Sequence, residues 1–239
     1  MKRKLQSRLK SKSRTIDKGR IRSVLIACED SVSAPTYFNK ILYKLKETNK
    51  LSLDSLIIPH TGKTHPSGVL KDLMLYKSQS GKTFEDYDSC WIVIDRDKSF
   101  LGRGGHSKKD FNRTLKKAKK FKINVAYSNP SFELWYLLHF TCRKTPIDRH
   151  KVVELVVEHI KTLDEDKYRN LAVGNIKSEK MTKQIFKDMQ ELQKTAIINA
   201  KKLKRFHKEK RRRVDPENAN PLTNIDKLII ELNNIDKLC

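Results

Sequence analysis

Short apolar runs that alternate with helical patterns limit the fold of this chain more than any other feature. The four runs are residues 23–28, 56–58, 90–94 and 123–127. Apolar residues recur at helical spacing between them, at about 35–45, 67–77 and 108–120. A continuous apolar strand followed by a helix is typical of a parallel sheet covered on both faces. We therefore predict an α/β domain over residues 23–140, with a parallel sheet flanked by helices.

The pattern changes after a further predicted helix at residues 132–140, because helical patterns alone follow it. Residues 141–239 form a predicted helical region that either completes the α/β domain or is appended to it. The sequence predicts one or two helices over residues 181–206 and a basic, polar linker over residues 207–220. Thr223 is the predicted cap of a last helix that runs to Leu238.

Positive charge dominates the surface. The 239 residues include 52 Lys and Arg against 28 Asp and Glu, a formal net charge of +24. Charge of this size indicates a polyanion binder, although a generally lysine-rich surface is the alternative. Residues 1–22 form a predicted basic arm, and residues 108–120 and 181–213 a predicted basic groove. The candidate nucleic-acid contacts are Arg96, Arg103, Lys108, Lys109, Lys116, Arg211 and Arg212.

Cysteine usage and hydropathy predict a reduced, cytoplasmic chain without a membrane span. The four cysteines form no CxxC pair, so structural zinc is not expected. No apolar run approaches the roughly 18 residues that a membrane helix needs.

Carboxylates follow two of the four predicted strands. Glu29 comes directly after the first run, and Asp95 and Asp97 close the third. The carboxyl ends of parallel strands meet at one edge of a sheet, where sites form. Alternation along the chain places Asp95 and Asp97 on the same side, with Arg96 opposite. These oxygen ligands favour Mg²⁺ or Mn²⁺, whereas the alternative is that they only cap turns and helices.

Residues near the fourth strand give weaker signals. Glu133 lies in the first turn of the following helix, where it either joins the site or only interacts with the helix dipole. Asn129 is the predicted N-cap of that helix. His139 and His207 are possible general bases, but ordinary core or boundary positions are favoured for both. Trp135, Leu138 and Phe140 have the spacing of core residues, which we favour over a base-stacking role.

Specific sequence blocks resemble a known family. The matching blocks are residues 24–29, 35–38, 91–97, 128–135, 137–140 and 220–223, with Leu228 and Leu232. Glu after a first strand with Asp-x-Asp after a later one is the pattern of the Toprim domain. With the Asn-Pro-Ser-Phe-Glu-Leu-Trp block at 129–135, the chain more closely resembles the RloB family, a Toprim-like family of bacterial defence loci.

The resemblance implies a function and residue roles. Glu29 would be a general acid/base as well as a metal ligand, Asp95 and Asp97 would hold the metal, and Glu133 would belong to the site. The implied activity is a metal-dependent nuclease in anti-phage defence, acting on RNA rather than DNA and possibly on tRNA, with possible partner proteins. The chain departs from the family pattern at Asp30 and Ala34, where a Gly and an acidic residue are expected.

Three other functions stay open from the sequence. The first is a non-catalytic nucleic-acid-binding component of a defence complex. The second is a phosphatase of the haloacid dehalogenase type, because residues 95–99 loosely match Asp-x-Asp-x-Thr, although that family carries its nucleophile on the first strand. The third is a docking partner that uses the helical region.

Overall fold

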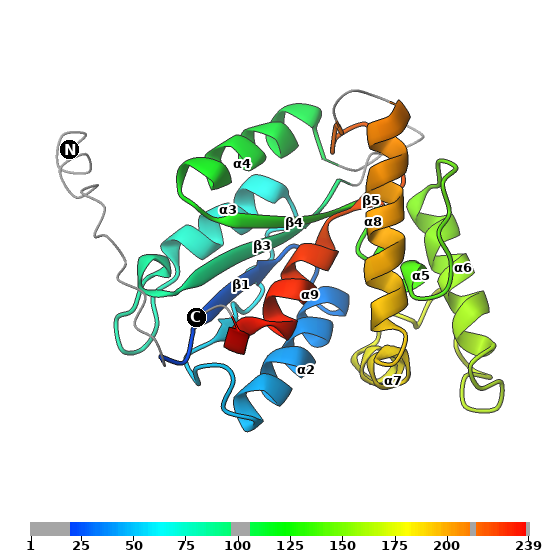
Figure 1. The fold of residues 1–239 in the computed structure, drawn as a ribbon, viewed down its shortest axis with the longest axis horizontal. Coiled ribbons are helices and arrows are strands. Elements are labelled where there is room, and N and C mark those ends of the chain that lie inside the picture. The colour runs from blue at the N-terminus through cyan, green and yellow to red at the C-terminus, as the bar shows by residue number, and fades with distance from the viewer. Residues whose placement is uncertain (1–19, 97–105, 211–213, 238–239) are drawn as a thin grey trace.

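A mostly parallel five-stranded sheet forms the centre of the molecule (Figure 1). The computed structural model describes residues 20–96, 106–210 and 214–237. The strands are β1 Val24–Cys28, β2 Leu56–Ile57, β3 Ser89–Asp95, β4 Asn124–Asn129 and β5 Leu222–Thr223. They lie in the order β2-β1-β3-β4-β5, and only β5 is antiparallel to its neighbour. The predicted fold class, a parallel sheet flanked by helices and followed by further helices, is confirmed.

Helices cover both faces of the sheet. They are α2 Ser33–Glu47, α3 Pro66–Leu75, α4 Lys108–Lys120, α5 Glu133–Leu138, α6 Arg149–Lys161, α7 Glu179–Met189, α8 Gln193–Lys210 and α9 Ile225–Asn233, with short 3-10 turns at Phe84–Asp86 and Ile235–Lys237. None of the helices in the described ranges is long and apolar enough to cross a membrane. Residues 181–206, predicted as one helix or two, form parts of two helices, α7 and α8, with a break between Met189 and Gln193.

Strand alternation divides the apolar residues between two cores. Leu25, Ala27, Ile92 and Ile94 face α3 and α4, where they meet buried residues such as Phe111. The intervening strand residues face the other side, where α2, α5, α6, α8 and α9 pack (Figure 1). The strands are therefore buried on both faces, as their continuous apolar sequences predicted.

The core on the side of α2 contains residues from both sides of position 140, where the predicted α/β domain ends. It joins Val24 and Val93 of the sheet to Val156 of α6, Leu203 of α8 and Leu228 of α9. The C-terminal helices therefore share one core with the sheet.

The predicted cap at Thr223 is wrong, because Thr223 belongs to β5 and α9 begins after Asn224. Side-chain hydrogen bonds hold this short strand against β4. The Asn224 Oδ1 accepts from the Tyr127 N–H at 2.6 Å, and the Thr223 hydroxyl donates to the Tyr127 carbonyl at 2.8 Å. A two-residue strand fixed by side chains leaves no apolar pattern for sequence reasoning to find.

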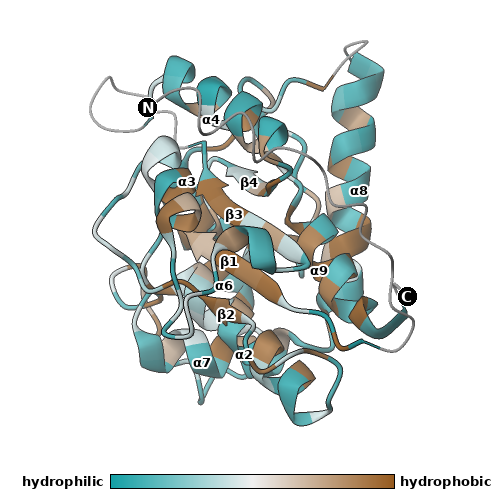
Figure 2. Ribbon diagram, turned by 90° about the vertical axis from the view of Figure 1, so that its left-hand side faces the viewer, coloured by the Kyte–Doolittle hydropathy of each residue, from teal (hydrophilic) through white to brown (hydrophobic). Residues whose placement is uncertain are grey.

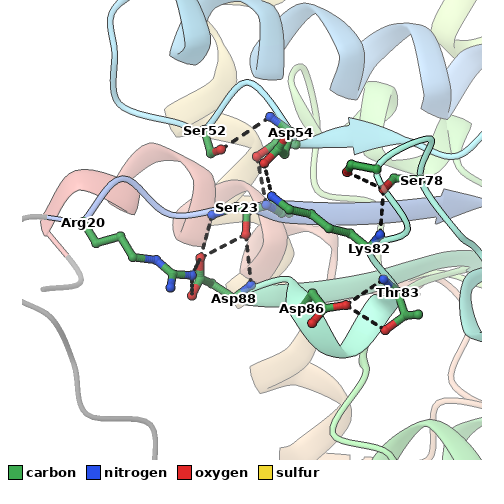
Figure 3. A network of polar contacts seen from close by, with 12 residues as sticks. Arg20, Ser23, Ser52, Asp54, Ser78, Lys82, Thr83, Asp86 and Asp88 are labelled. Atoms are coloured by element: carbon green, nitrogen blue, oxygen red, sulfur yellow. Dashed lines mark hydrogen bonds and ion pairs between the residues drawn. The ribbon is translucent and has the colours of Figure 1, made fainter.

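A polar network closes the amino ends of β1 and β3 (Figure 3). The Asp88 carboxylate accepts hydrogen bonds from the Arg20 guanidinium at 2.9 Å and from the Ser23 backbone N–H at 2.8 Å. Thr83 and Asp86 form a reciprocal capping box beside it. These hydrogen bonds tie the start of β1 to the residue before β3.

Candidate active site

The carboxyl ends of β1 and β3 bring Glu29 and Asp95 together. The Glu29 N–H donates to the Val93 carbonyl at 2.9 Å, which continues the β1–β3 ladder by one residue. The Glu29 Oε2 then accepts the backbone N–H of Asp95 at 3.0 Å. The predicted proximity of these residues at one sheet edge therefore holds. Asp97 lies outside the described residues.

Two histidines contact Glu29, and the sequence predicted neither contact. The His106 Nε2 meets the Glu29 Oε1, while the His60 Nε2–H donates to the Glu29 carbonyl at 3.0 Å. Glu29 is 8% exposed. The two histidines fix its backbone and its side chain, but neither lies in a recognisable motif, so only the folded chain identifies them.

Glu133 is almost completely buried at the same edge, with 1% of its surface exposed. Its carboxylate accepts hydrogen bonds from the Ser131 hydroxyl at 2.8 Å and the Ser33 hydroxyl at 3.3 Å. The Lys177 Nζ lies 2.8 Å from the Glu133 Oε1. Burial alone would raise the pKa of Glu133, but the Lys177 ammonium and these hydrogen bonds hold it below its usual range.

Lys177 is a second residue that sequence reasoning missed. It lies in the segment between α6 and α7. Burial acts to lower its pKa, yet the carboxylates of Glu133, Asp30 and Asp95 raise it overall. Its side chain is 41% exposed, so solvent reaches Lys177 although the carboxylate that it pairs with is buried.

The Asp30 carboxylate accepts hydrogen bonds from the backbone at the start of α2. Its Oδ1 accepts the N–H groups of Val32 at 2.6 Å and Ser33 at 2.8 Å, and its Oδ2 accepts that of Ala34 at 2.7 Å. These groups are otherwise orphans at a helix start. Burial raises the pKa of Asp30, the Ala34 N–H opposes this, and the nearby Glu133 carboxylate adds to the increase. Asp30 therefore satisfies backbone N–H groups at the start of α2 and adds a carboxylate near Glu133.

The carboxylates at this edge repel one another. Burial raises the pKa of Asp95 well above its usual value, and the charges of Glu29, Glu133 and Asp30 raise it further. Lys177 opposes the shift. We call Glu29, Asp30, Asp95 and Glu133 the carboxylate cluster. Its excess negative charge is an electrostatic reason for a cation to bind here.

Oxygen-only donors of this kind fit Mg²⁺ or Mn²⁺. Within residues 20–96, 106–210 and 214–237, no three His, Cys, Asp or Glu side chains are grouped tightly enough to hold an ion as they stand. Glu29 and Asp95 offer two of the three predicted ligands, and the third, Asp97, is not described. The metal set of Glu29, Asp95 and Asp97 thus stays a prediction, consistent in donor chemistry with the two residues that are placed.

A family model described as RloB-like protein matches residues 24–232, which is most of the chain. The chain belongs to the RloB-like family. No curated protein and no solved structure matches it. The family suspected from the sequence blocks is therefore confirmed, and the carboxylate cluster lies within the matched residues.

Arg96 of the RloB-like chain is not placed as predicted. It is 3% exposed, its Nη1 donates to the His106 carbonyl at 3.0 Å, and its guanidinium lies 5.7 Å from the centroid of the Phe111 ring. Alternation did turn Arg96 away from Asp95, but into the core beside α4 rather than into solvent. The structure thus contradicts its proposed nucleic-acid contact and gives it a role in positioning His106.

The remaining predicted nucleic-acid contacts divide by position. Lys108, Lys109 and Lys116 are exposed on α4, although the Lys108 Nζ is paired with the Glu217 carboxylate at 3.0 Å. Arg103, Arg211 and Arg212 lie outside the described residues. The C-terminal half of α8 adds exposed cations: Lys201, Lys202, Lys204, Arg205, Lys208 and Lys210. Figure 2 shows α4 and the upper part of α8 as hydrophilic helices.

Other sequence predictions near the site are corrected or confirmed. Asn129 ends β4 instead of capping α5, whose N-cap is Phe132, and the Asn129 amide donates to the Ala219 carbonyl at 2.8 Å. Trp135 and Leu138 are fully buried, and Phe140 packs against the same core, as predicted.

The two histidines proposed as less favoured bases are both tied to backbone carbonyls. The His139 Nδ1–H donates to the Trp135 carbonyl at 2.9 Å, and the His207 Nε2–H donates to the Pro221 carbonyl at 2.8 Å. His139 is buried, and burial lowers its pKa to about 4. It is therefore a neutral core residue.

His139 should make the folded state sensitive to acid. Its pKa is lower in the folded chain than the value of about 6.5 for an unfolded one, so below pH 6.5 only the unfolded chain gains the proton. Stability is then lost as the pH falls from about 6.5 towards 4, by about 2 kcal/mol between pH 6.5 and 5. Urea unfolding of wild type and His139→Phe across this range should give a difference that changes with pH. A constant difference would contradict this assignment.

Proposed function

We propose that this RloB-like protein is a metal-dependent nuclease that hydrolyses nucleic-acid phosphodiesters. The observation that carries the proposal is the carboxylate cluster, in which burial and like charge together raise the pKa of Asp95. Such perturbed groups at a sheet edge are typical of catalytic sites. The net charge of +24 and the exposed cations of α4 and α8 support a polyanionic substrate.

The residues of the edge suggest a division of roles. Glu29 and Asp95, with Asp97, would hold Mg²⁺ or Mn²⁺, which when bound supplies Lewis-acid stabilisation of the charge that develops on the phosphate. Glu29 would also move a proton at its carboxylate, which His106 orients. Glu133 is kept ionised by Lys177 and so maintains the negative potential of the site. Arg96 would position His106 through its carbonyl.

The substrate and setting are proposed from the family. Resemblance to Toprim-like effectors favours RNA over DNA, possibly tRNA, and a role in anti-phage defence inside the bacterial cytoplasm. Partner proteins of a defence system are proposed on the same ground. These assignments rest on analogy, whereas the phosphodiester chemistry rests on the carboxylate cluster.

The substrate class can be tested directly. Purified protein would be incubated with labelled tRNA, other RNA, and single- and double-stranded DNA in Mg²⁺, Mn²⁺ or EDTA. We expect cutting of RNA that requires the metal and stops in EDTA. Equal cutting in EDTA would contradict metal dependence, and cutting of DNA alone would contradict the RNA assignment.

A non-catalytic nucleic-acid binder is the second candidate. It is favoured by the internal pairing of the cluster, since Glu133 has Lys177 and Glu29 has the Asp95 N–H and His106 as partners. A purely structural cluster would be satisfied in the same way. Metal-independent binding to nucleic acid without cutting of any substrate would identify this function.

The exposed face of α4 should contribute salt-dependent binding. Lys109 and Lys116 lie two helical turns apart on one side of α4, and neither is buried. The double variant Lys109→Gln/Lys116→Gln should weaken RNA binding and reduce the slope of log K against log salt by about 1 to 2, because fewer counterions are released. Lys180→Gln is the matched control, because Lys180 is an exposed residue of α7, at the other end of the molecule (Figure 1). An unchanged slope would exclude α4 from the interface.

A further inference from the structure

Phe206 is an aromatic residue on α8 that the apolar cores do not use. It is only half-buried, and neither of the two core clusters formed by the described residues includes it. The buried side of α8 is formed instead by Ala196, Ala200 and Leu203. A single half-buried apolar side chain is common on a protein surface, so the groups around Phe206 decide whether it has a role.

Cations lie over the Phe206 ring. The Lys210 Nζ is 4.3 Å from the ring centroid, and the Lys144 Nζ is 5.5 Å from it. Both are within the range of a cation–π interaction, which at exposed sites contributes roughly 0.5–1 kcal/mol. Such weak contacts with long, mobile side chains can be exchanged for a ligand that offers a π face and a negative charge.

The neighbouring His207 side chain helps to hold the Phe206 ring in place. His207 contacts the Phe206 ring edge-on at 5.3 Å between centroids, and its hydrogen bond to the Pro221 carbonyl ties this turn of α8 to the segment before β5. The C-terminal end of α8 and the whole of α4 lie at the top of the molecule in both Figure 1 and Figure 2. Phe206 is therefore held on a rigid helix at the end of the molecule that also carries the α4 cations.

Two exposed cations of α8 lie on the side of the helix that carries Phe206. They are Lys202 and Lys210, four residues before and after the ring. Aromatic rings among basic side chains are the arrangement that binds single-stranded nucleic acid, because each base stacks on a ring and each phosphate meets a cation. A duplex gains nothing from such a ring, since its bases are already stacked on one another.

We propose that Phe206 is a base-stacking platform for an unpaired stretch of nucleic acid, flanked by Lys144 and Lys210 as phosphate contacts. The inference rests on the nucleic-acid binding in the proposed function and adds that the bound feature is single-stranded. When a base occupies the ring, the two ammonium groups move from its face to the adjacent phosphates. The apolar contact and the charge contact then act on the same nucleotide.

Binding measured without cleavage tests this proposal. Full-length protein in EDTA would be titrated into labelled single-stranded RNA, single-stranded DNA and an RNA duplex of equal length, with fluorescence anisotropy as the readout. Phe206→Ala should weaken single-strand binding by about 5- to 100-fold and leave duplex binding unchanged. Phe206→Trp should retain the affinity. Ile198→Ala, which removes another apolar side chain of α8 that is 52% exposed, is the matched control and should have no effect.

The salt dependence separates stacking from charge. Phe206→Ala should lower the affinity with no change in the slope of log K against log salt, because the ring carries no charge. Lys210→Gln should lower both the affinity and the slope. Thermal unfolding of each variant shows whether α8 stays folded.

The binding results distinguish failure of the platform from failure of the proposed function. Equal single-strand binding by Phe206→Ala and wild type would overturn the platform alone. Equal weakening for single strands and duplex would also overturn it, as loss of α8 structure would produce that result. No binding of any nucleic acid by wild type would remove both this inference and the proposed function. A loss confined to RNA or to DNA would support the platform and identify the sugar that it accepts.

Discussion

Asp95→Asn should reduce metal-dependent cleavage by about a thousandfold while leaving nucleic-acid affinity within about twofold. The substitution keeps the shape of the side chain but removes the charge that would hold the cation. A loss of roughly 4 kcal/mol of transition-state stabilisation gives a factor of this size. Affinity should persist because the exposed cations of α4 and α8 do not depend on Asp95.

The matched control is Asp166→Asn, since Asp166 is a surface carboxylate whose side chain is 91% exposed. Single-turnover cleavage and anisotropy should be measured on the same preparations. In EDTA, Asp95→Asn should unfold no more easily than wild type, because it removes one of the mutually repelling carboxylates. If Asp95→Asn lost binding and folding together, Asp95 would have a structural role instead.

Lys177→Met should lower the free energy of unfolding by about 3 kcal/mol. The Glu133 carboxylate, 1% exposed, would lose its ion pair and remain beside Asp30 and Asp95. Breaking a buried pair from one side costs about 3–5 kcal/mol. We expect the low end of that range, because the Lys177 side chain is 41% exposed and water can reach the pair.

Neutralising the carboxylate should rescue this variant. Lys177→Met/Glu133→Gln should recover most of the lost stability, since no uncompensated charge stays buried. Urea unfolding at pH 7 in EDTA measures all of the variants, with Lys180→Met at an exposed position of α7 as the control. A double variant as unstable as Lys177→Met would show that Lys177 acts through packing and not through Glu133.

Much of the fold was predictable because it follows from local patterns. The apolar runs before Glu29 and Asp95 favoured strands of a covered parallel sheet, in which the carboxyl ends of the strands lie at one edge. Glu133 was correctly placed in the first turn of α5 because the helical pattern begins there. Trp135 was predictable as core from its spacing.

The side chains that contact these residues were not predictable, because they come from distant segments that meet only in the folded chain. Lys177 pairs with Glu133, which is more than 40 residues away in the sequence. His106 contacts Glu29, which is more than 70 residues away. Neither Lys177 nor His106 lies in a segment with a periodic pattern. Alternation indicated which side of β3 Arg96 faces, but not that Phe111 and the His106 carbonyl would enclose it there. The sequence did not single out Phe206. Its proposed role depends on Lys144 and Lys210, which the fold places over its ring.

Direct binding of Mn²⁺ is the measurement that tests the central claim, that Glu29 and Asp95 hold a divalent cation at the carboxyl edge of the sheet. Electron paramagnetic resonance of Mn²⁺ titrated with wild type, Asp95→Asn and Asp166→Asn reports the free ion without requiring cleavage. We predict that wild type and Asp166→Asn bind the ion, that Mg²⁺ competes for it, and that Asp95→Asn loses at least tenfold in affinity, as removal of a ligand charge requires. Equal binding by all three proteins, or no binding by wild type with or without nucleic acid, would contradict the account.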